Sequence, residues 1–251
     1  MSMGQLPGES AGALATRLAA ILGEEALVHE QAQLECLSSD VYSAGVTAAM
    51  AIRPASREHL AEAIAAITAH GFAVIARGGG MSYTGGYTPT YANSVIVDMS
   101  RLDRIIDISA EDMIITVEAG VTWQQIYEAL EPLGLRLPFF GTFSGSRATV
   151  GGGMSNGALF MGTARYGTAA EIVLGLEVIT ADGRLIRTGQ AAFDKGKPFY
   201  RTYGPDLTGL FVHDAGALGI KTVITMRLIE PPANNDYASF VFTTMDGAAQ
   251  A

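Results

Sequence analysis

The chain has 251 residues, of which 49% are hydrophobic, and a formal net charge of −9 at pH 7. This length and apolar content allow a well-buried core, in one large domain or two small ones. The acidic balance argues against a nucleic-acid or anionic-membrane surface, because both need concentrated lysine and arginine.

The single cysteine and the N-terminus limit the cellular setting. Cys36 alone excludes an internal disulfide and a cysteine-based zinc site, fits a reducing compartment, and is expected to pack in the core. The first ten residues carry no signal-peptide pattern, and no apolar run reaches the roughly 18 residues of a membrane span. We therefore expect a cytoplasmic protein without a bound metal.

Residues 1–50 form an expected N-terminal helical segment. Ser10 is a candidate cap for a first helix that buries Leu14, Leu18 and Ile21 and ends at Gly23. Residues 24–50 have a mixed pattern that predicts no particular element.

Residues 51–108 are expected to form a first lobe built on a strand, a helix and a strand. A short apolar segment ends at Arg53, and Ser56 is then predicted to cap a helix that Gly71 stops. A buried strand over 72–76 follows, and the apolar run 94–99 predicts another buried strand of the same parallel sheet. The crossover should be right-handed.

The stretch FAVIARGGGMSYTGGY, residues 72–87, is the most informative part of the chain. Five glycines in nine residues indicate positive φ angles, close approach of another group to the main chain, or both. Successive exposed N–H groups in such a loop form a concavity that suits phosphate oxygens. Ser82 and Thr84 would add hydroxyl donors, and Arg77 is a candidate counter-charge.

Two familiar phosphate loops are excluded by spacing. Tyr83 stands where the Rossmann fingerprint needs its third glycine, and Gly86 stands where a P-loop needs its lysine. The alternative to an anion-binding loop is a tight surface turn.

Residues 109–232 are expected to form a second lobe. The segments 105–108 and 113–118 predict two strands, and Thr122 with Gln125 forms a capping box for a helix that turns Trp123 and Tyr127 inward. A second stretch of bare backbone covers 149–153. Asp182-Gly183 predicts a type I′ hairpin turn, and 216–230 predicts a strand with exposed Lys221 and Arg227.

Residues 233–251 are expected to begin a further domain that the sequence leaves truncated. Asp246 and the alanines after it suggest the first turn of a helix, and six residues cannot form a stable helix alone.

Seven motifs in this order resemble the flavoprotein oxidases and dehydrogenases with the vanillyl-alcohol-oxidase, or PCMH, type of FAD-binding domain, in the branch of D-lactate dehydrogenase and glycolate oxidase. The resemblance covers about residues 20–232. Each motif alone is weak, but the seven keep the family's order and spacing. They are RPAS at 53–56, VIARGGGMSYTGG at 74–86, VIVDMSRLDRII at 95–106, ITVEAGVTWQQIYEAL at 115–130, ATVGGGMSNG at 148–157, ARYGTAAEIVLGLEVITADGRLIRTG at 164–189 and YGPDLTGLFVHDAGALGIKT at 203–222.

The resemblance implies an α+β, PCMH-type FAD-binding domain of two lobes with the cofactor between them. The pyrophosphate would lie on the first glycine loop, the second glycine segment would run along the cofactor, and the backbone at Ile220 would lie near its adenine or ribitol side. The expected cofactor-binding residues are Arg77, Gly78, Gly79, Gly80, Met81, Ser82, Thr84, Gly85, Thr149, Gly151, Gly152, Gly162, Tyr166 and Ile220.

Departures from the family pattern bear on the flavin linkage. Some relatives attach the flavin through a histidine directly after the glycines, where this chain has Met81, or through a cysteine where it has Arg147-Ala148. Non-covalent FAD is therefore expected. The family's usual Gly-Ser-Glu-Gly reads His213-Asp214-Ala215-Gly216 here, which points to a separate sub-branch.

Several side chains have both a structural and a functional interpretation. His29, His59 and His70 are expected at the surface, whereas His213 lies in a matched motif and is a candidate neighbour of the flavin. Arg147 and Arg165 either face the cofactor or pair with surface carboxylates. Trp123 and Tyr127 are expected in the core.

The leading hypothesis is the FAD-binding part of an oxidoreductase that oxidises a small α-hydroxy acid of the D-lactate or glycolate type by hydride transfer to flavin N5. In such relatives the substrate pocket and its base come from a C-terminal cap domain, so the sequence names no catalytic residue. The alternatives are a flavin-binding electron-transfer subunit that works with a partner subunit, and a scaffold without a cofactor. A homodimer is compatible with the sequence, and no nucleic-acid partner is expected.

Overall fold

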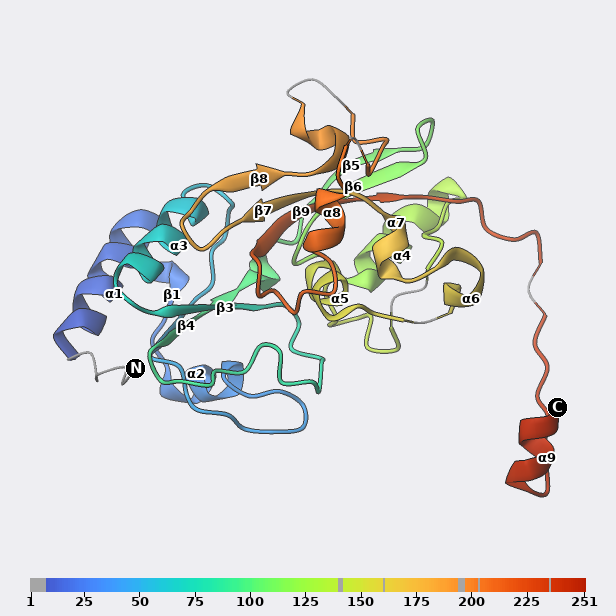
Figure 1. Ribbon diagram of the computed structural model, residues 1–251, viewed down its shortest axis with the longest axis horizontal. Helices are drawn as coiled ribbons and strands as arrows, with labels where there is room; N and C mark the ends of the chain where they lie inside the picture. The colour runs from blue at the N-terminus through green and yellow to red at the C-terminus, as the bar shows by residue number, and fades with distance from the viewer. Residues whose placement is uncertain (1–7, 140–141, 160, 194–196, 203, 235) are drawn as a thin grey trace.

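The computed structural model describes residues 8–139, 142–159, 161–193, 197–202, 204–234 and 236–251. Its core consists of two β-sheets with helices packed against them (Figure 1). The first sheet takes its strands from residues 27–98 and the second from residues 105–227. The domain boundaries expected from the sequence stay predictions.

The first sheet has four strands in the order β1-β2-β4-β3. β2 (Met50–Ile52) and β3 (Ala73–Arg77) both pair in parallel with β4 (Ser94–Asp98), which lies between them, while β1 (Leu27–Val28) pairs antiparallel with β2. The predicted strand-helix-strand unit is thus confirmed, with one later strand inserted at its centre. β4 is buried along its whole length, because helices cover both faces of the sheet.

Alternate side chains of β4 pack against helices on opposite faces of the sheet. Val95 and Val97 lie in the same buried cluster as residues of α1 (Gly8–Leu22) and α3 (Leu60–Ala69). Ile96 points the other way, into the cluster of α2 (Gln31–Leu37). This period of two is the geometry of a strand between two helix layers.

Two predicted helix starts in this lobe are wrong. α1 already includes Ser10, which is its third residue. α3 begins after His59, which has a φ of 60° and makes no side-chain cap, and not at Ser56. The segment before α3 is held as a turn because Arg57 forms ion pairs with the second lobe. The predicted helix ends are confirmed, because Gly23 and Gly71 follow α1 and α3 with φ angles of 91° and 79°.

The strand before the glycine loop is only half-buried, which corrects the prediction. β3 is an edge strand, and Val74, Ile75 and Ala76 keep partial exposure. Its end at Ala76 and Arg77 lines a cavity between the sheets, so the exposure has a structural cause.

The second sheet is antiparallel and has the order β5-β6-β9-β7-β8. The predicted strands are confirmed as β5 (Ile105–Ser109), β6 (Ile114–Glu118), β7 (Val173–Ile179), β8 (Leu185–Arg187) and β9 (Ile220–Arg227). Ile179 and Ile220 lie in the core cluster of the first lobe, so the two lobes share apolar packing.

The capping box at the start of α4 (Trp123–Leu130) is confirmed in both of its hydrogen bonds. Trp123 and Ile126 are buried against α5 (Val150–Asn156) and the second sheet. Tyr127, predicted inward, is 46% exposed, because its ring falls at the polar edge of this short helix.

The β7–β8 hairpin is confirmed, but its turn is not type I′. Gly183 has a φ of 77°, whereas Asp182 is absent from the positive-φ residues of the described chain. The amide of Gly183 donates to the carbonyl of Thr180 at 2.8 Å, and the amide of Thr180 donates to the carbonyl of Arg184 at 3.0 Å. This is a three-residue loop with glycine in the left-handed position.

The remaining elements are short helices. They are η1 (Glu24–Ala26), η2 (Met99–Arg101), η3 (Glu131–Leu133), α6 (Thr163–Tyr166), α7 (Ala169–Ile172), η4 (Gly189–Ala192), α8 (Leu207–Leu210) and α9 (Met245–Gln250). α9 confirms the helical turn predicted at Asp246. Leu228 and Ile229 still pack on the second lobe, whereas residues 231–234 and 236–244 lie away from both sheets and α9 stands apart (Figure 1).

Three predictions about exposure are wrong. Cys36 is exposed on α2, because the inward positions of this helix are taken by Leu34 and Leu37. Lys221 is buried, since a register shift between Glu177 and Val178 interrupts the alternation of β9. Arg227 is half-buried and donates to the carbonyl of Tyr166. Among the described helices none is long and apolar enough to cross a membrane.

Glu118 at the end of β6 connects the lobes. Its side chain is 1% exposed and accepts hydrogen bonds from Arg57 at 3.2 Å and Arg104 at 2.8 Å, while Arg57 also reaches Glu177 at 2.7 Å. Burial alone would raise the pKa of Glu118, but the hydrogen bonds from Arg104 and the charges of Arg104 and Arg57 outweigh it and hold the pKa below its ordinary value.

Replacing Glu118 by glutamine should destabilise the fold by about 2 kcal/mol at pH 7, since the hydrogen bonds to an ionised carboxylate are lost. A lowered folded-state pKa gives stability that is complete above the unfolded value of about 4.3 and is lost as the pH falls through the folded value. The difference in unfolding free energy from wild type should therefore shrink below about pH 4.

Urea unfolding of E118Q and wild type at pH 7 and at acidic pH measures this difference, with E230Q at an exposed position as the control. An equal cost at both pH values would contradict the assignment.

Candidate functional site

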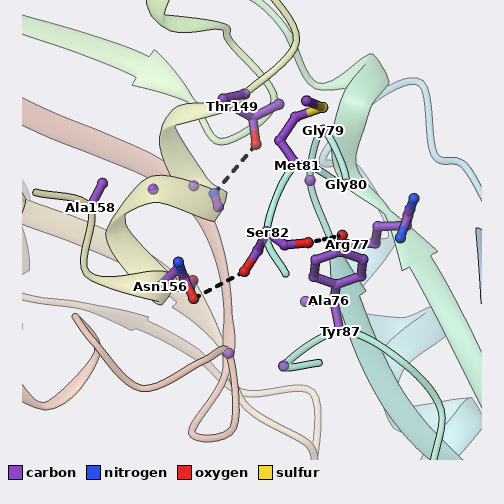
Figure 2. A pocket seen from close by; sticks show the side chains of 18 of the residues that line it. Ala76, Arg77, Gly79, Gly80, Met81, Ser82, Tyr87, Thr149, Asn156 and Ala158 are labelled. Atoms are coloured by element: carbon purple, nitrogen blue, oxygen red, sulfur yellow. Dashed lines mark hydrogen bonds between the residues drawn. The ribbon is translucent and has the colours of Figure 1, made fainter. Parts of the chain in front are cut away.

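The two glycine-rich segments predicted to face each other are in direct contact (Figure 2). A Cβ on Gly78 would overlap the Oγ1 of Thr149, and a Cβ on Gly79 would overlap the carbonyl oxygen of Arg147. Glycine is thus required at both positions because the loop after β3 packs against the backbone before α5.

Only part of the first glycine loop needs a left-handed conformation. Gly80 and Gly85 have φ angles of 65° and 71°. A Cβ on Gly80 would also overlap the guanidinium of Arg77, which lies under the loop. Close packing explains two glycines of the triplet, and close packing with backbone conformation explains the third.

The first loop supplies free backbone donors. In the described part of the chain, the amide N–H groups of residues 79–82 donate to no protein acceptor. They are half-exposed and follow one another along the loop. Consecutive free amides of this kind form a site for phosphate oxygens.

The second segment is not bare backbone, which corrects the prediction. Thr149 caps α5, and the first amides of the helix are already bonded: Val150 to the carbonyl of Val121 and Gly151 to the carbonyl of Ala119, both at 2.8 Å, and Gly152 to Thr149 Oγ1 at 3.3 Å. This segment therefore shapes the site by its lack of side chains more than by hydrogen bonding.

The glycines of α5 allow close packing against the second lobe. A Cβ on Gly151 would lie 2.7 Å from the Cβ of Ala119, and one on Gly153 would lie 2.6 Å from the indole ring of Trp123. The Nε1 of Trp123 is buried and has no hydrogen-bond partner in the described structure. The helix consequently lies flat against Ala119 and Trp123, and its other side forms a cavity wall.

A cavity of about 760 Å³ lies between the first glycine loop, α5 and the start of β9. Its volume is in the upper part of the range for small-molecule sites, about 300 to 1,000 Å³. Among the described residues that line it there is no aspartate or glutamate, and Arg77 and Lys221 are the cations. The protein has a net charge of −9, yet the described lining of its cavity carries positive side chains and no negative ones. This distribution of charge favours an anionic ligand.

Arg77 supports the loop from below. Its side chain donates to the carbonyl of Ser39 at 2.9 Å and lies 4.6 Å from the ring centre of Tyr87. The Tyr87 hydroxyl in turn donates to the carbonyl of Ser82 at 2.8 Å (Figure 2). Burial raises the pKa of Tyr87 while the charge of Arg77 opposes that rise, so the phenol stays protonated as a donor.

Asp40 fixes the far end of the loop. Its carboxylate accepts from the amide of Gly85 at 3.1 Å and from the amides of Tyr42 and Ser43 at 2.8 and 2.6 Å. These backbone hydrogen bonds, chiefly those of Ser43 and Tyr42, lower the pKa of Asp40 and keep it ionised at neutral pH.

Asn156 at the end of α5 connects the two segments at the mouth of the cavity. Its Oδ1 accepts from the hydroxyls of Ser82 at 3.4 Å and Thr84 at 3.1 Å. Figure 2 shows Asn156 and Ser82 facing each other across the gap between loop and helix.

The structure gathers most of the expected site residues around this one cavity. Those that line it are Arg77, Gly78, Gly79, Gly80, Met81, Ser82, Thr84, Thr149, Gly151, Gly152 and Ile220. Gly85, Gly162 and Tyr166 lie outside its lining. The amide of Gly85 is occupied by Asp40, while Gly162 packs against the carbonyl of Pro138 and begins α6.

Sequence reasoning missed several residues of the cavity wall. Ser155 and Asn156 belong to the matched motif at 148–157, of which only the glycines were considered. Tyr83, Tyr87 and Phe143 lie in or next to the glycine-rich stretches, where single aromatic residues gave no signal. Lys221 could not be found from alternation, because the bulge in β9 reverses its direction.

Three candidate side chains lie outside the lining. His213 is exposed, with a φ of 59°, and its amide donates to the carbonyl of Met154 at 2.9 Å, so its contribution is to loop structure. Arg147 and Arg165 are exposed, and Arg165 stacks on the ring of Tyr166 at 5.2 Å. His29 and His59 are exposed as predicted.

Fold and cavity together define a two-lobed nucleotide-binding domain, with free backbone donors on one side of the cavity and closely packed glycines on the other. The FAD binding domain family matches residues 48–189, which is more than half of the chain. The chain belongs to this family, which has the PCMH-type fold. The cofactor of the domain is FAD.

Relatives of this chain include a glycolate oxidase subunit and D-lactate dehydrogenases, and the chain matches only part of each. It is 30% identical over 199 residues to the glycolate oxidase subunit GlcD of Bacillus subtilis, a match that covers 79% of this chain and 41% of the relative. It is 31% identical over 196 residues to a mitochondrial D-lactate dehydrogenase [cytochrome] of Arabidopsis thaliana, covering 78% of this chain and 33% of the relative. The chain spans well under half of either protein.

Solved structures show the same fold at lower identity. p-Cresol methylhydroxylase aligns with a TM-score of 0.77 at 22% identity, covering 91% of this chain and 45% of that one. An alkyldihydroxyacetonephosphate synthase aligns with a TM-score of 0.76 at 16% identity, covering 93% and 42%. The expected α+β fold of PCMH type is confirmed.

The charge and the apolar surface of the cavity suit the phosphates and the aromatic rings of FAD. FAD carries two phosphate charges, and the wall offers the free amides of residues 79–82 without a carboxylate among the described lining residues. Its apolar part, which includes Met81, Trp123 and Phe143, suits aromatic rings.

Substituting alanine for Gly79 should abolish FAD retention, because the new Cβ meets backbone atoms of Arg147 that cannot move aside alone. Flavin absorbance per mole of purified protein measures retention. Gly12→Ala is a matched control: its Cβ meets nothing within 4 Å on α1, so it should keep full flavin content and gain up to about 1 kcal/mol of stability. Normal flavin content in G79A would contradict the placement of the phosphate loop.

Proposed function

We propose that this chain is the FAD-binding part of a flavin-dependent oxidoreductase that oxidises a small α-hydroxy acid of the D-lactate or glycolate type. The observation that carries the proposal is the cavity between the first glycine loop and α5, whose described lining residues include no carboxylate. The choice of substrate class draws support from the names of the relatives, a glycolate oxidase subunit and D-lactate dehydrogenases.

The bound flavin supplies the hydride acceptor of such a reaction at its N5 atom. The residues of this chain bind and orient it. The amides of residues 79–82 would donate to the pyrophosphate, and Tyr87 and Asp40 hold the loop in position through Ser82 and Gly85. α5, packed against Ala119 and Trp123, would form the other wall of the site.

We assign the catalytic base to no residue of this chain. The cavity lining holds no histidine, aspartate or glutamate among the described residues, and His213 lies outside it. The relatives are more than twice as long as the matched region. We therefore propose that a further domain or a partner subunit completes the substrate site. As a separate proposal, the protein functions in the cytoplasm.

The proposed cofactor is held without a covalent bond. Met81 follows the glycine triplet, and Ala148 precedes Thr149 in the cavity wall, so neither position offers a histidine or cysteine. Cys36 is exposed on α2 and lies outside the cavity lining. Tight binding then depends on backbone donors and packing.

The purified chain should be yellow or take up added FAD stoichiometrically, and acid denaturation should release all flavin into the supernatant. Bound flavin should be bleached by D-lactate or glycolate under anaerobic conditions only slowly, because the substrate site is incomplete. Absorbance spectra before and after each step measure both results, and L-lactate serves as the control substrate.

A chain that takes up no FAD would overturn the cofactor assignment. Flavin that precipitates with the protein would contradict non-covalent binding. Rapid bleaching at the rate of a complete enzyme would show that this chain holds the base.

A further inference from the structure

Lys221 is a buried lysine in the wall of the cofactor cavity. Its side chain is 2% exposed, and its ammonium donates to Asp214 Oδ1 at 2.7 Å, where the carboxylate is also 2% exposed. The described structure gives the ammonium no second acceptor, although an ammonium carries three N–H donors. Burial lowers the pKa of Lys221, and the hydrogen bond and charge of Asp214 oppose that fall.

The position of Lys221 results from an irregularity in the second sheet. Val223 lies opposite Glu177 and Lys221 lies opposite Val178, so Thr222 is an extra residue in β9. Such a bulge turns the residue before it to the other face of the sheet. Lys221 thereby leaves the face predicted from simple alternation and joins the lining of the cavity.

Asp214 belongs to a loop, residues 213–219, that closes this side of the cavity. The Asp214 carboxylate accepts from the amides of Gly216 at 3.0 Å and Leu218 at 3.4 Å. The loop is bonded to α5 through the amide of Ala215, which donates to the carbonyl of Ser155 at 2.9 Å. Asp214 thus has a structural task besides its ion pair.

The same loop touches the first lobe beside the glycine loop. A Cβ on Gly86 would lie 3.4 Å from the Cβ of Ala215, and one on Gly216 would lie 3.6 Å from the Cβ of Ala76. Ala76 directly precedes Arg77 at the end of β3. The loop whose Asp214 pairs with Lys221 is therefore packed against the end of β3 and against Gly86, on either side of the amides of residues 79–82.

We propose that Lys221 is a cofactor-binding residue that donates to a diphosphate oxygen of bound FAD, with Asp214 fixing its direction. Arg77 lies under the loop, where it donates to Ser39 and contacts the ring of Tyr87. The ammonium of Lys221 makes one hydrogen bond among the described residues, to Asp214, which leaves two of its three N–H donors for a ligand. A cationic donor complements the neutral amides of residues 79–82 and balances part of the charge of a diphosphate. The inference deepens the FAD-binding role of this cavity and does not depend on the oxidised substrate.

The test separates contact with the cofactor from a purely structural ion pair. Replacing both partners by neutral residues of similar shape, K221M/D214N, removes the buried pair without leaving a lone charge. The amide side chain that replaces the carboxylate keeps one oxygen acceptor, enough for the shorter of the two loop hydrogen bonds, that of the Gly216 amide. FAD and riboflavin, which lacks the diphosphate, are titrated into flavin-free protein by fluorescence quenching. K197M removes a lysine that pairs with Asp112 away from the cavity and is the matched control.

The double variant should melt near the wild-type temperature without flavin. Its dissociation constant for FAD should rise on the order of 10- to 100-fold, the usual worth of a hydrogen bond from a charged donor. Its affinity for riboflavin should stay within about twofold of wild type, and its FAD binding should depend less on salt. K197M should leave both affinities unchanged.

Wild-type FAD affinity in the double variant would show that the pair is structural only. An equal loss for FAD and riboflavin would show a distorted wall and no contact with the diphosphate. Should the double variant fail to fold, K221R keeps the charge and decides the question: its ratio of FAD to riboflavin affinity should remain near wild type, and a fall to that of K221M would overturn the proposal. Loss of FAD binding in G79A with full binding in K221M would leave the cofactor site standing and remove this inference alone.

Discussion

Contact between two backbones without side chains determines the architecture of this domain. The loop after β3 and the segment before α5 come from different lobes, and they touch at Gly78 and Gly79 with no room for a Cβ. That contact sets how near the first sheet stands to α5, and hence the width of the cavity between them. At Gly79 the facing atoms belong to the main chain of Arg147, so rotamer changes cannot relieve an intrusion there. Two further contacts hold the lobes together. They are the apolar cluster that Ile179 and Ile220 share with the first lobe, and the ion pairs of Arg57 with the second lobe.

Charge in the cavity is arranged against the background of an acidic protein. Carboxylates near the cavity are neutralised by other groups: Asp40 accepts from backbone amides, Glu118 pairs with arginines, and Asp214 pairs with Lys221. Neutral amides need no compensating charge, whereas Arg77 and Lys221 are each held by a protein acceptor. A site of this kind keeps its shape without its ligand, which lowers the cost of ordering on binding.

Sequence reasoning recovered the elements whose signals are local. The strands β2 to β9, the capping box at Thr122 and eleven of the fourteen expected site residues around the cavity follow from periodicity, glycine placement and motif order. The errors share a cause, because each depends on tertiary context. α3 starts late since Arg57 is engaged with the other lobe, and Lys221 is buried because of one extra residue in β9. Likewise the glycines of α5 resemble a donor loop in sequence, yet their amides are already bonded to Ala119 and Thr149.

The cavity also draws on parts of the chain beyond the segment that defines the family. Asp40 and Ser39 precede residue 48 and brace the glycine loop, and β9 follows residue 189 yet occupies the middle of the second sheet. An excised piece with the family's own limits would lack the strand to which β6 and β7 both bond, together with the floor under Arg77. The structural unit that forms the cavity is consequently larger than the segment that the family matches, and its two ends are as much a part of the binding site as the glycines at its centre.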